Sequence, residues 1–192
     1  MSSGHRLTLA HKALQHRIGA ATAARVAPMW ALLDPFDLDR TFIRWLSAVA
    51  PIVQEQFEVS AVAAARYIEA FRRAAGIAPA ALPVAGSLSL TGLHTSMLVT
   101  GPVAVKSATA RGVPIDRAMS VAEASSTAAA SRHALSGGRG VVTSDPEARG
   151  HTRIAAARAC GFCTSLAGIE YPSDHPFQAH DGCGCTAEPV YR

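Results

Sequence analysis

The sequence predicts a mainly α-helical protein that ends in a small, irregular α+β module stapled by cysteine and histidine. Three observations support this fold class. Alanine, the best helix former, supplies 39 of the 192 residues. Apolar residues recur at three- and four-residue steps through much of the chain before residue 136. All four cysteines, with three of the eight histidines, fall in the last 42 residues.

The first two helices are expected over residues 5–27 and 39–76. Pro28 ends the first helix, and Gly76 suits the C-terminal end of the second. Pro51 lies inside the second helix, where a proline removes a backbone N–H donor. We therefore expect Pro51 to kink or interrupt this helix.

Two further helices are expected over residues 88–110 and 116–135. They follow or overlap an uncharged segment rich in proline and glycine near 76–102, which we interpret as a hinge. Pro102 suits the first turn of a second helical piece, and the pair Gly137–Gly138 is expected to stop the last helix. Beyond that pair, short strands are expected at Val141–Val142, at Ile154 and at Pro189–Tyr191.

This pattern divides the chain into a basic helical arm (1–33), a helical body (34–136) and a C-terminal module (137–192). The arm carries four basic residues and no acid, and so accounts for the net charge of +4. A basic arm can contact phosphates or an acidic protein surface. On a helix its basic side chains do not form one stripe, which favours a protein contact that buries Leu7, Leu14 and Ile18.

Neither a leader peptide nor a membrane span is expected. The first 25 residues interleave basic and apolar residues, which is not typical of a signal peptide. The uncharged run over residues 74–105 is long enough to span a bilayer, but three prolines and four glycines interrupt it. These features predict a soluble protein made in a reducing cytosol, without membrane contact.

The cysteines form two close pairs, Cys160-Gly-Phe-Cys163 and Cys183-Gly-Cys185, with His180 just before the second. A C-x-x-C turn directs two thiolates into one site, and alternate residues of an extended C-x-C segment share a face. Four soft ligands at this spacing suit Zn²⁺. The ligand set is either the four cysteines or three of them with His180.

Three other interpretations remain open. Cys160 or Cys163 can form a disulfide with Cys183 or Cys185, or all four can remain buried, unlinked thiols. In the third, Cys163 or Cys160 acts as a nucleophile with His180 as its general base. We favour a protein without catalytic activity, because the sequence identifies no third residue that would orient the histidine.

The C-terminal part of the chain contains a distinctive set of segments, namely Gly137–Arg139, Thr152–Ile154, Ala159–Cys163, Leu166–Ala167, Tyr171 and His180–Tyr191. In these segments the chain resembles the phage Mu F-like minor head proteins of actinobacterial tailed phages. The resemblance extends more weakly into the helical body, through Leu33–Pro35, Thr41, Trp45–Leu46, Tyr67, Phe71–Arg72 and Gly101–Pro102. Relatives of this group are often labelled capsid maturation proteases.

The resemblance implies a structural minor head protein that acts beside the portal during procapsid assembly and head morphogenesis. Its implied partners are the portal protein and the major capsid protein. Its implied location is the interior of the virion head, after assembly in the bacterial host cytoplasm. Two alternatives are a capsid maturation protease that uses the Cys163–His180 pair, and a zinc-stapled module that contacts packaged DNA through residues 1–33.

Overall fold

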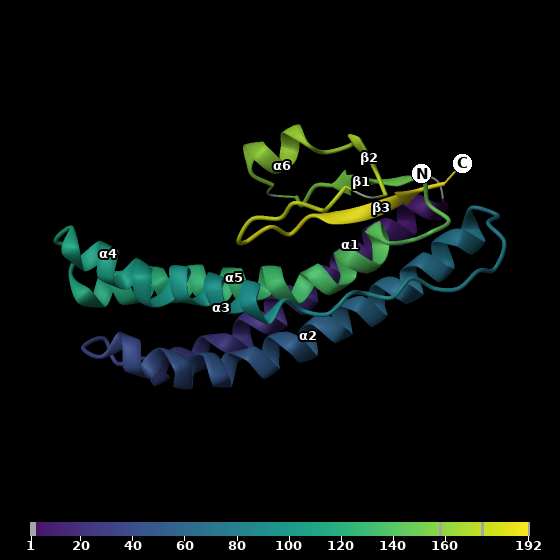
Figure 1. The fold of residues 1–192 in the computed structure, drawn as a ribbon. Coiled ribbons are helices and arrows are strands. Elements are labelled where there is room, and N and C mark those ends of the chain that lie inside the picture. The colour runs from purple at the N-terminus through teal and green to yellow at the C-terminus, as the bar shows by residue number, and fades with distance from the viewer. Residues whose placement is uncertain (1–2, 158, 174, 192) are drawn as a thin grey trace.

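A computed structural model describes residues 3–157, 159–173 and 175–191. A long helical bundle carries a small sheet module (residues 150–191) over one half of its length (Figure 1). This arrangement confirms the mainly α fold class with a small α+β module. The helices of the bundle are α1 (Ser3–Val26), η1 (Ala27–Leu32), α2 (Leu38–Ala74), α3 (Leu90–Leu98), η2 (Val99–Val103), α4 (Ala104–Ala110) and α5 (Ile115–Thr143).

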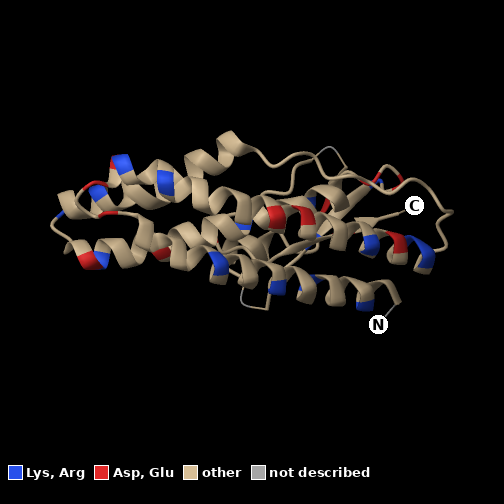
Figure 2. Cartoon of the chain, turned by 90° about the horizontal axis from the view of Figure 1, so that it is seen from below, with Lys and Arg blue, Asp and Glu red and all other residues tan. Residues whose placement is uncertain are grey.

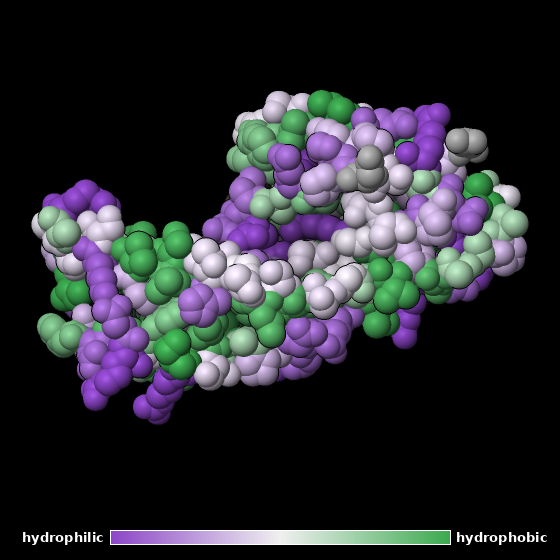
Figure 3. All heavy atoms as spheres, in the orientation of Figure 1, coloured by the Kyte–Doolittle hydropathy of each residue, from purple (hydrophilic) through white to green (hydrophobic). Residues whose placement is uncertain are grey.

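Helices α1, α2 and α5 pack against one another, and α3, η2 and α4 pack on α5 in the half of the bundle that the module leaves uncovered (Figure 1). The core of that half is centred on Trp45, which is fully buried and meets Trp30 edge-on at 5.3 Å between ring centroids. Some apolar side chains remain at the surface there (Figure 3), including those of Leu90, Val99 and Val103.

Helix α5 continues through Gly137–Gly138 and ends at Thr143, so the expected helix stop is wrong. The expected strand at Val141–Val142 is also wrong, because both valines are buried in this helix. A Cβ on Gly137 would overlap the carbonyl oxygen of Phe57 on α2. A glycine inside a helix costs only about 1 kcal/mol relative to alanine, and here it permits the close contact between α2 and α5.

Helix α2 continues through Pro51. Of the expected kink or interruption, the interruption is wrong, whereas a kink stays a prediction. Pro51 is exposed, and a carbonyl group left without its helical donor on the solvent side can bind water instead. The expectation at Pro102 is confirmed. The backbone departs from helical geometry at Gly101 (φ −96°, ψ −106°), within η2, which separates α3 from α4.

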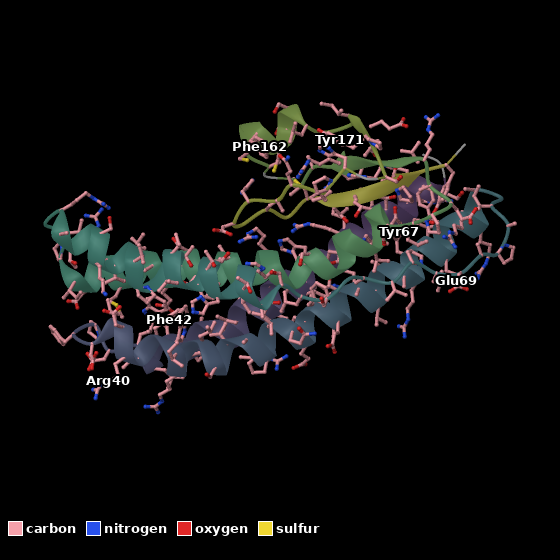
Figure 4. All side chains as sticks on the ribbon, in the orientation of Figure 1. Arg40, Phe42, Tyr67, Glu69, Phe162 and Tyr171 are labelled. Atoms are coloured by element: carbon pink, nitrogen blue, oxygen red, sulfur yellow. The ribbon has the colours of Figure 1, made fainter. Side chains whose placement is uncertain are left out.

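Helix α1 is an integral part of the bundle, and its buried face is largely polar. Thr8 hydrogen-bonds to Tyr67 of α2 at 2.8 Å, at the end of the bundle beneath the sheet (Figure 4). Further along, Ser60 donates to the side-chain oxygen of Gln15 at 2.7 Å. Such pairs satisfy polar groups that would be costly to bury alone.

The packing of α1 in the bundle bears on the expectation that Leu7, Leu14 and Ile18 contact another protein. Ile18 is buried within the chain and so is not free to contact another protein, whereas Leu14 remains partly exposed. The division of the chain at residues 33 and 136 stays a prediction, and α5 crosses the second of these positions.

The sheet module contains three antiparallel strands in the order β2-β1-β3, namely β2 (Glu170–Pro172), β1 (Gly150–Ile154) and β3 (Thr186–Val190). One short helix, α6 (Gly161–Ser165), lies between β1 and β2. Figure 4 shows Phe162 on this helix and Tyr171 on β2. A hydrophilic hollow separates part of the module from the bundle (Figure 3).

A buried ion pair joins the bundle to the module. Arg72 of α2 forms a salt bridge with Asp145, and both side chains are almost fully buried. The hydroxyl of Tyr191 donates to the same carboxylate at 2.6 Å. Arg72 also donates to the carbonyl oxygens of Ala80 and Ala81, at 3.1 Å each, and so fixes part of the segment interpreted as a hinge.

Among the described residues, no helix is both long enough and apolar enough to cross a membrane.

Candidate metal centre

Two short segments bring the four cysteines and His180 together. Cys160 lies at the N-terminal cap of α6 and Cys163 within its single turn, where Thr164 N–H donates to the Cys160 carbonyl at 2.9 Å. The other segment turns at Gly182, which has a φ of +75° that favours glycine. There Cys183 N–H donates to the His180 carbonyl at 3.0 Å, which closes the turn.

His180 lies between the first two thiols. Its Nε2 atom is 3.1 Å from Cys163 Sγ and 3.2 Å from Cys160 Sγ. The ligand atoms of these three residues all lie within 4.8 Å of one another, as do those of Cys163, Cys183 and Cys185. Cys163 therefore belongs to both groups, and the five residues that the sequence singled out form one continuous cluster.

One sulfur–sulfur separation agrees with tetrahedral zinc. Cys163 Sγ and Cys183 Sγ are 3.7 Å apart. A Zn–S bond of about 2.3 Å in a tetrahedron gives an S···S edge of roughly 3.8 Å. All four cysteines lie in the described part of the chain and are free thiols there.

The family model for the VG15 protein matches residues 5–192. The chain belongs to the VG15 family. This is a family of phage proteins, so the sequence-based expectation of a phage-encoded protein is confirmed. No curated protein and no solved structure gives a significant match to the chain.

Two buried arginines flank the cluster of this VG15 protein. The side chain of Arg153 directs Nη1 toward Cys163 Sγ and Cys183 Sγ, at 3.8 Å from each. Arg139 of α5 donates to the backbone carbonyls of Cys183, at 2.6 Å, and Cys185, at 3.2 Å. Both residues are at least 95% buried.

Within the described residues, neither Arg139 nor Arg153 forms a salt bridge with a carboxylate. An uncompensated guanidinium inside a protein is strongly unfavourable. Zn²⁺ bound by four thiolates carries a net charge of −2, and by three thiolates and a neutral histidine −1. Apart from the cysteine sulfurs, the described partners of both guanidinium groups are backbone carbonyls and the Phe177 ring, which carry no formal charge. A metal–thiolate centre would add negative charge beside them, and the residues present fit zinc.

The thiol environments differ within the cluster. A hydrogen bond from the Cys185 thiol and the charge of Arg139 lower the pKa of Cys183. A backbone hydrogen bond from Cys163 lowers the pKa of the exposed Cys160 thiol. Burial raises the pKa of Cys163. Two sulfurs are therefore prepared for the thiolate form that binds metal.

His180 is oriented through its second nitrogen, since Nδ1 lies 2.8 Å from the carbonyl oxygen of Asp181. A donor N–H at Nδ1 leaves the lone pair of Nε2 directed at the sulfurs. Metal-binding histidines commonly donate their other nitrogen to a carbonyl group in this way. The same arrangement also orients a general base, so it is compatible with both a metal ligand and a Cys–His pair.

The arginines were not identified from the sequence, because nothing in the local pattern around Arg139 or Arg153 links them to cysteine. His175, which the sequence places close to the motif, stacks on Tyr171 at 4.8 Å between ring centroids. Tyr171 in turn stacks on His151 of β1 at 5.7 Å. His151 also packs on Phe177, at 6.2 Å between ring centroids, so these rings continue the packing around the cluster and His175 lies outside the ligand set.

Proposed function

We propose that this VG15 protein is a structural minor head protein, of the Mu F-like type, that acts beside the portal in procapsid assembly. In this proposal a zinc ion held by Cys163, Cys183 and Cys185, with Cys160 or His180 as the fourth ligand, maintains the sheet module. The zinc supplies four ligand bonds that link α6 to the segment before β3.

The observation that carries this proposal is the composition of the module core. The buried residues of that core are Cys163, Cys183 and Cys185, surrounded by partly buried alanines and Phe177. A nucleophilic cysteine must be accessible, and three of the four thiols are buried against one another, where they can act as ligands but not as nucleophiles. This arrangement favours a structural role.

The portal protein and the major capsid protein are the proposed partners, and the head interior is the proposed location. The support is the VG15 match over residues 5–192 together with the resemblance of the cysteine motif. The test is quantitative mass spectrometry of purified procapsids, combined with affinity purification of the portal protein. We expect the chain to copurify with both, and its absence from procapsids would contradict the proposal.

A second candidate function is a capsid maturation protease. It is favoured by one observation, the exposed Cys160 thiol that lies 3.2 Å from an oriented His180 imidazole. The variants Cys160→Ser and His180→Ala, each checked for folding, test it through the mass of the major capsid protein in heads. We expect normal processing. Unprocessed capsid protein in a folded variant would establish the protease instead.

A further inference from the structure

A cavity of about 1040 Å³ lies between α1 and the sheet module. Its α1 wall is formed by Leu9, Lys12, Ala13, His16 and Arg17. The opposite wall consists of Ala156, Ala157 and Ala159 together with the cysteine cluster and His180. This volume is at the upper end of the range for ligand-binding pockets, and its walls come from segments more than 130 residues apart in sequence.

The α1 wall of this cavity is basic. Lys12 and Arg17 line it, and no aspartate or glutamate lines the cavity among the described residues. On the opposite wall, the negative charge of a metal–thiolate centre is offset by the buried guanidinium groups of Arg139 and Arg153. Helix α1 as a whole carries basic residues without an acidic one (Figure 2). Low-dielectric walls of one charge sign concentrate the field and attract ligands of the opposite charge.

Lys12 also links the two walls of the cavity. Lys12 Nζ donates to the carbonyl oxygen of Ala155, at the end of β1. This hydrogen bond joins α1 to the module beside the cavity. Arg17, one and a half turns further along α1, is exposed, and no salt bridge is recorded for it among the described residues.

The lining favours a peptide over nucleic acid. Small alanine side chains on both walls allow a backbone to approach closely, and Leu9 adds apolar contact area. Single-stranded nucleic acid is usually held by aromatic side chains on which its bases stack. No phenylalanine, tyrosine or tryptophan lines this cavity within the described residues.

We propose that this cavity binds an acidic peptide segment of a partner head protein. The carboxylates of the peptide pair with Arg17 and accept a hydrogen bond from the His16 ring, and its small apolar side chains pack on Leu9 and the alanines. The proposal names the partner chemistry of the assembly role proposed above and therefore rests on it. Its test uses purified protein without heads, so that it can fail while the assembly role stands.

The probe is a fluorescein-labelled twelve-residue peptide of repeating Glu-Ala-Leu-Glu sequence, titrated with the zinc-loaded full-length protein by fluorescence anisotropy. The same peptide with glutamine in place of every glutamate controls for apolar binding. A (dT)₁₂ oligonucleotide controls for nucleic acid. We expect the acidic peptide to bind at least tenfold more tightly than either control, with an affinity that falls as salt is raised.

Arg17→Glu should weaken peptide binding by about tenfold or more, because it replaces attraction with repulsion. Ala157→Glu, on the opposite wall, should have a similar effect through its own charge. Arg6→Glu is the matched control. Arg6 lies on nearly the same face of α1, about 16 Å away along the helix axis, and does not line the cavity.

Equal binding by Arg17→Glu and Arg6→Glu would overturn the proposal, because the charge effect would then not be local to the cavity. Tighter binding of (dT)₁₂ than of the acidic peptide would also overturn it and assign the cavity to nucleic acid. Failure of the peptide to bind at millimolar concentration would overturn it as well. A loss of binding in both cavity variants, with Arg6→Glu unaffected, would support it.

Discussion

The bundle and the sheet module are stabilised by different means. The bundle core contains large apolar side chains, of which Trp45, Ile68 and Leu93 are all but fully buried. The module core centres on three cysteines, with alanines and one phenylalanine around them. Burial of apolar area can stabilise the bundle. The module contributes only Ala187 and Phe177 to the apolar cluster that it shares with α2 and α5, and a segment of this size usually requires disulfides or a metal.

This difference explains why one chain can have a stable helical body and a chemically dependent module. The bundle should fold from hydrophobic burial alone, whereas the module should depend on the state of its thiols. Metal binding at such a site contributes directly to folding free energy. The following experiments test whether the two regions can be separated in this way.

The largest expected effect is that of metal removal. Chelation, or the variant Cys163→Ser, should unfold the sheet module, because structural zinc contributes on the order of 10 kcal/mol to folding. Limited proteolysis should then cut within residues 150–191, while the far-ultraviolet circular dichroism of the helices changes little. Ser165→Ala, in an exposed position of the same helix α6, is the control. A metal-free protein with an intact module would contradict the zinc assignment.

The next effect tests the bundle at the contact of α2 and α5. Gly137→Ala should destabilise the protein by about 3 kcal/mol, because the added methyl group meets the Phe57 carbonyl. Gly140→Ala, three residues later in the same helix, has open space around its added methyl group. It should stabilise by up to about 1 kcal/mol. Urea unfolding monitored by circular dichroism measures both, and equal effects would disprove the close contact.

A smaller expected effect is a loss of stability at acid pH that arises in the bundle rather than in the module. His11 of α1 is buried and stacked on Tyr67 at 4.3 Å between ring centroids, and neither ring nitrogen has a hydrogen-bond partner among the residues that the structure describes. Burial lowers the pKa of His11 to about 4, from 6.5. The unfolded chain therefore binds a proton first, and stability falls as the pH drops from about 6.5 toward 4. At pH 5 this loss is about 2 kcal/mol.

His11→Phe keeps a ring against Tyr67 and removes the titrating group, so it should abolish that part of the pH dependence. Urea unfolding of the helical signal at pH 7 and pH 5 measures it. His16→Phe, on the same helix but exposed, should retain the wild-type loss. Protonation of the thiolates also weakens the module at acid pH, but equally in both variants. An unchanged pH dependence in His11→Phe would show that His11 is accessible to protons in the folded state.

The smallest expected effect tests whether Arg139 compensates the negative charge of the metal–thiolate centre. Arg139→Met should weaken zinc affinity about 10- to 100-fold, the usual range for residues that support metal ligands, because the thiolates lose a buried counter-charge. Competition with a chromophoric chelator measures this affinity. Arg149→Met removes an exposed arginine of the surface pair with Glu170 and should leave the affinity unchanged. Equal affinities in the two variants would show that Arg139 does not compensate the centre.

Much of the helical architecture could be predicted from local sequence alone. Apolar spacing and alanine content are properties of a single helical segment. For this reason the boundaries of α1 and α2 and the break near Pro102 were predicted to within a few residues. The cysteine motif likewise predicted that each pair of thiols would share one site, because C-x-x-C and C-x-C spacings are local geometry; the clustering of all four cysteines near His180 in the sequence suggested that the two pairs would meet. These features depend on neighbours in the chain.

The tertiary structure decided the rest, because those features depend on residues distant in sequence. Gly137 stays helical since α2 lies against it, and the polar face of α1 is buried since Tyr67 and Ser60 of α2 provide its partners. The same holds for Arg139, which reaches the cysteines across 44 residues. The sequence by itself determined the helices and the grouping of the thiols. Packing between distant parts of the chain determined that Arg139 lies against the cysteines and that helix α1 lies opposite them across the cavity.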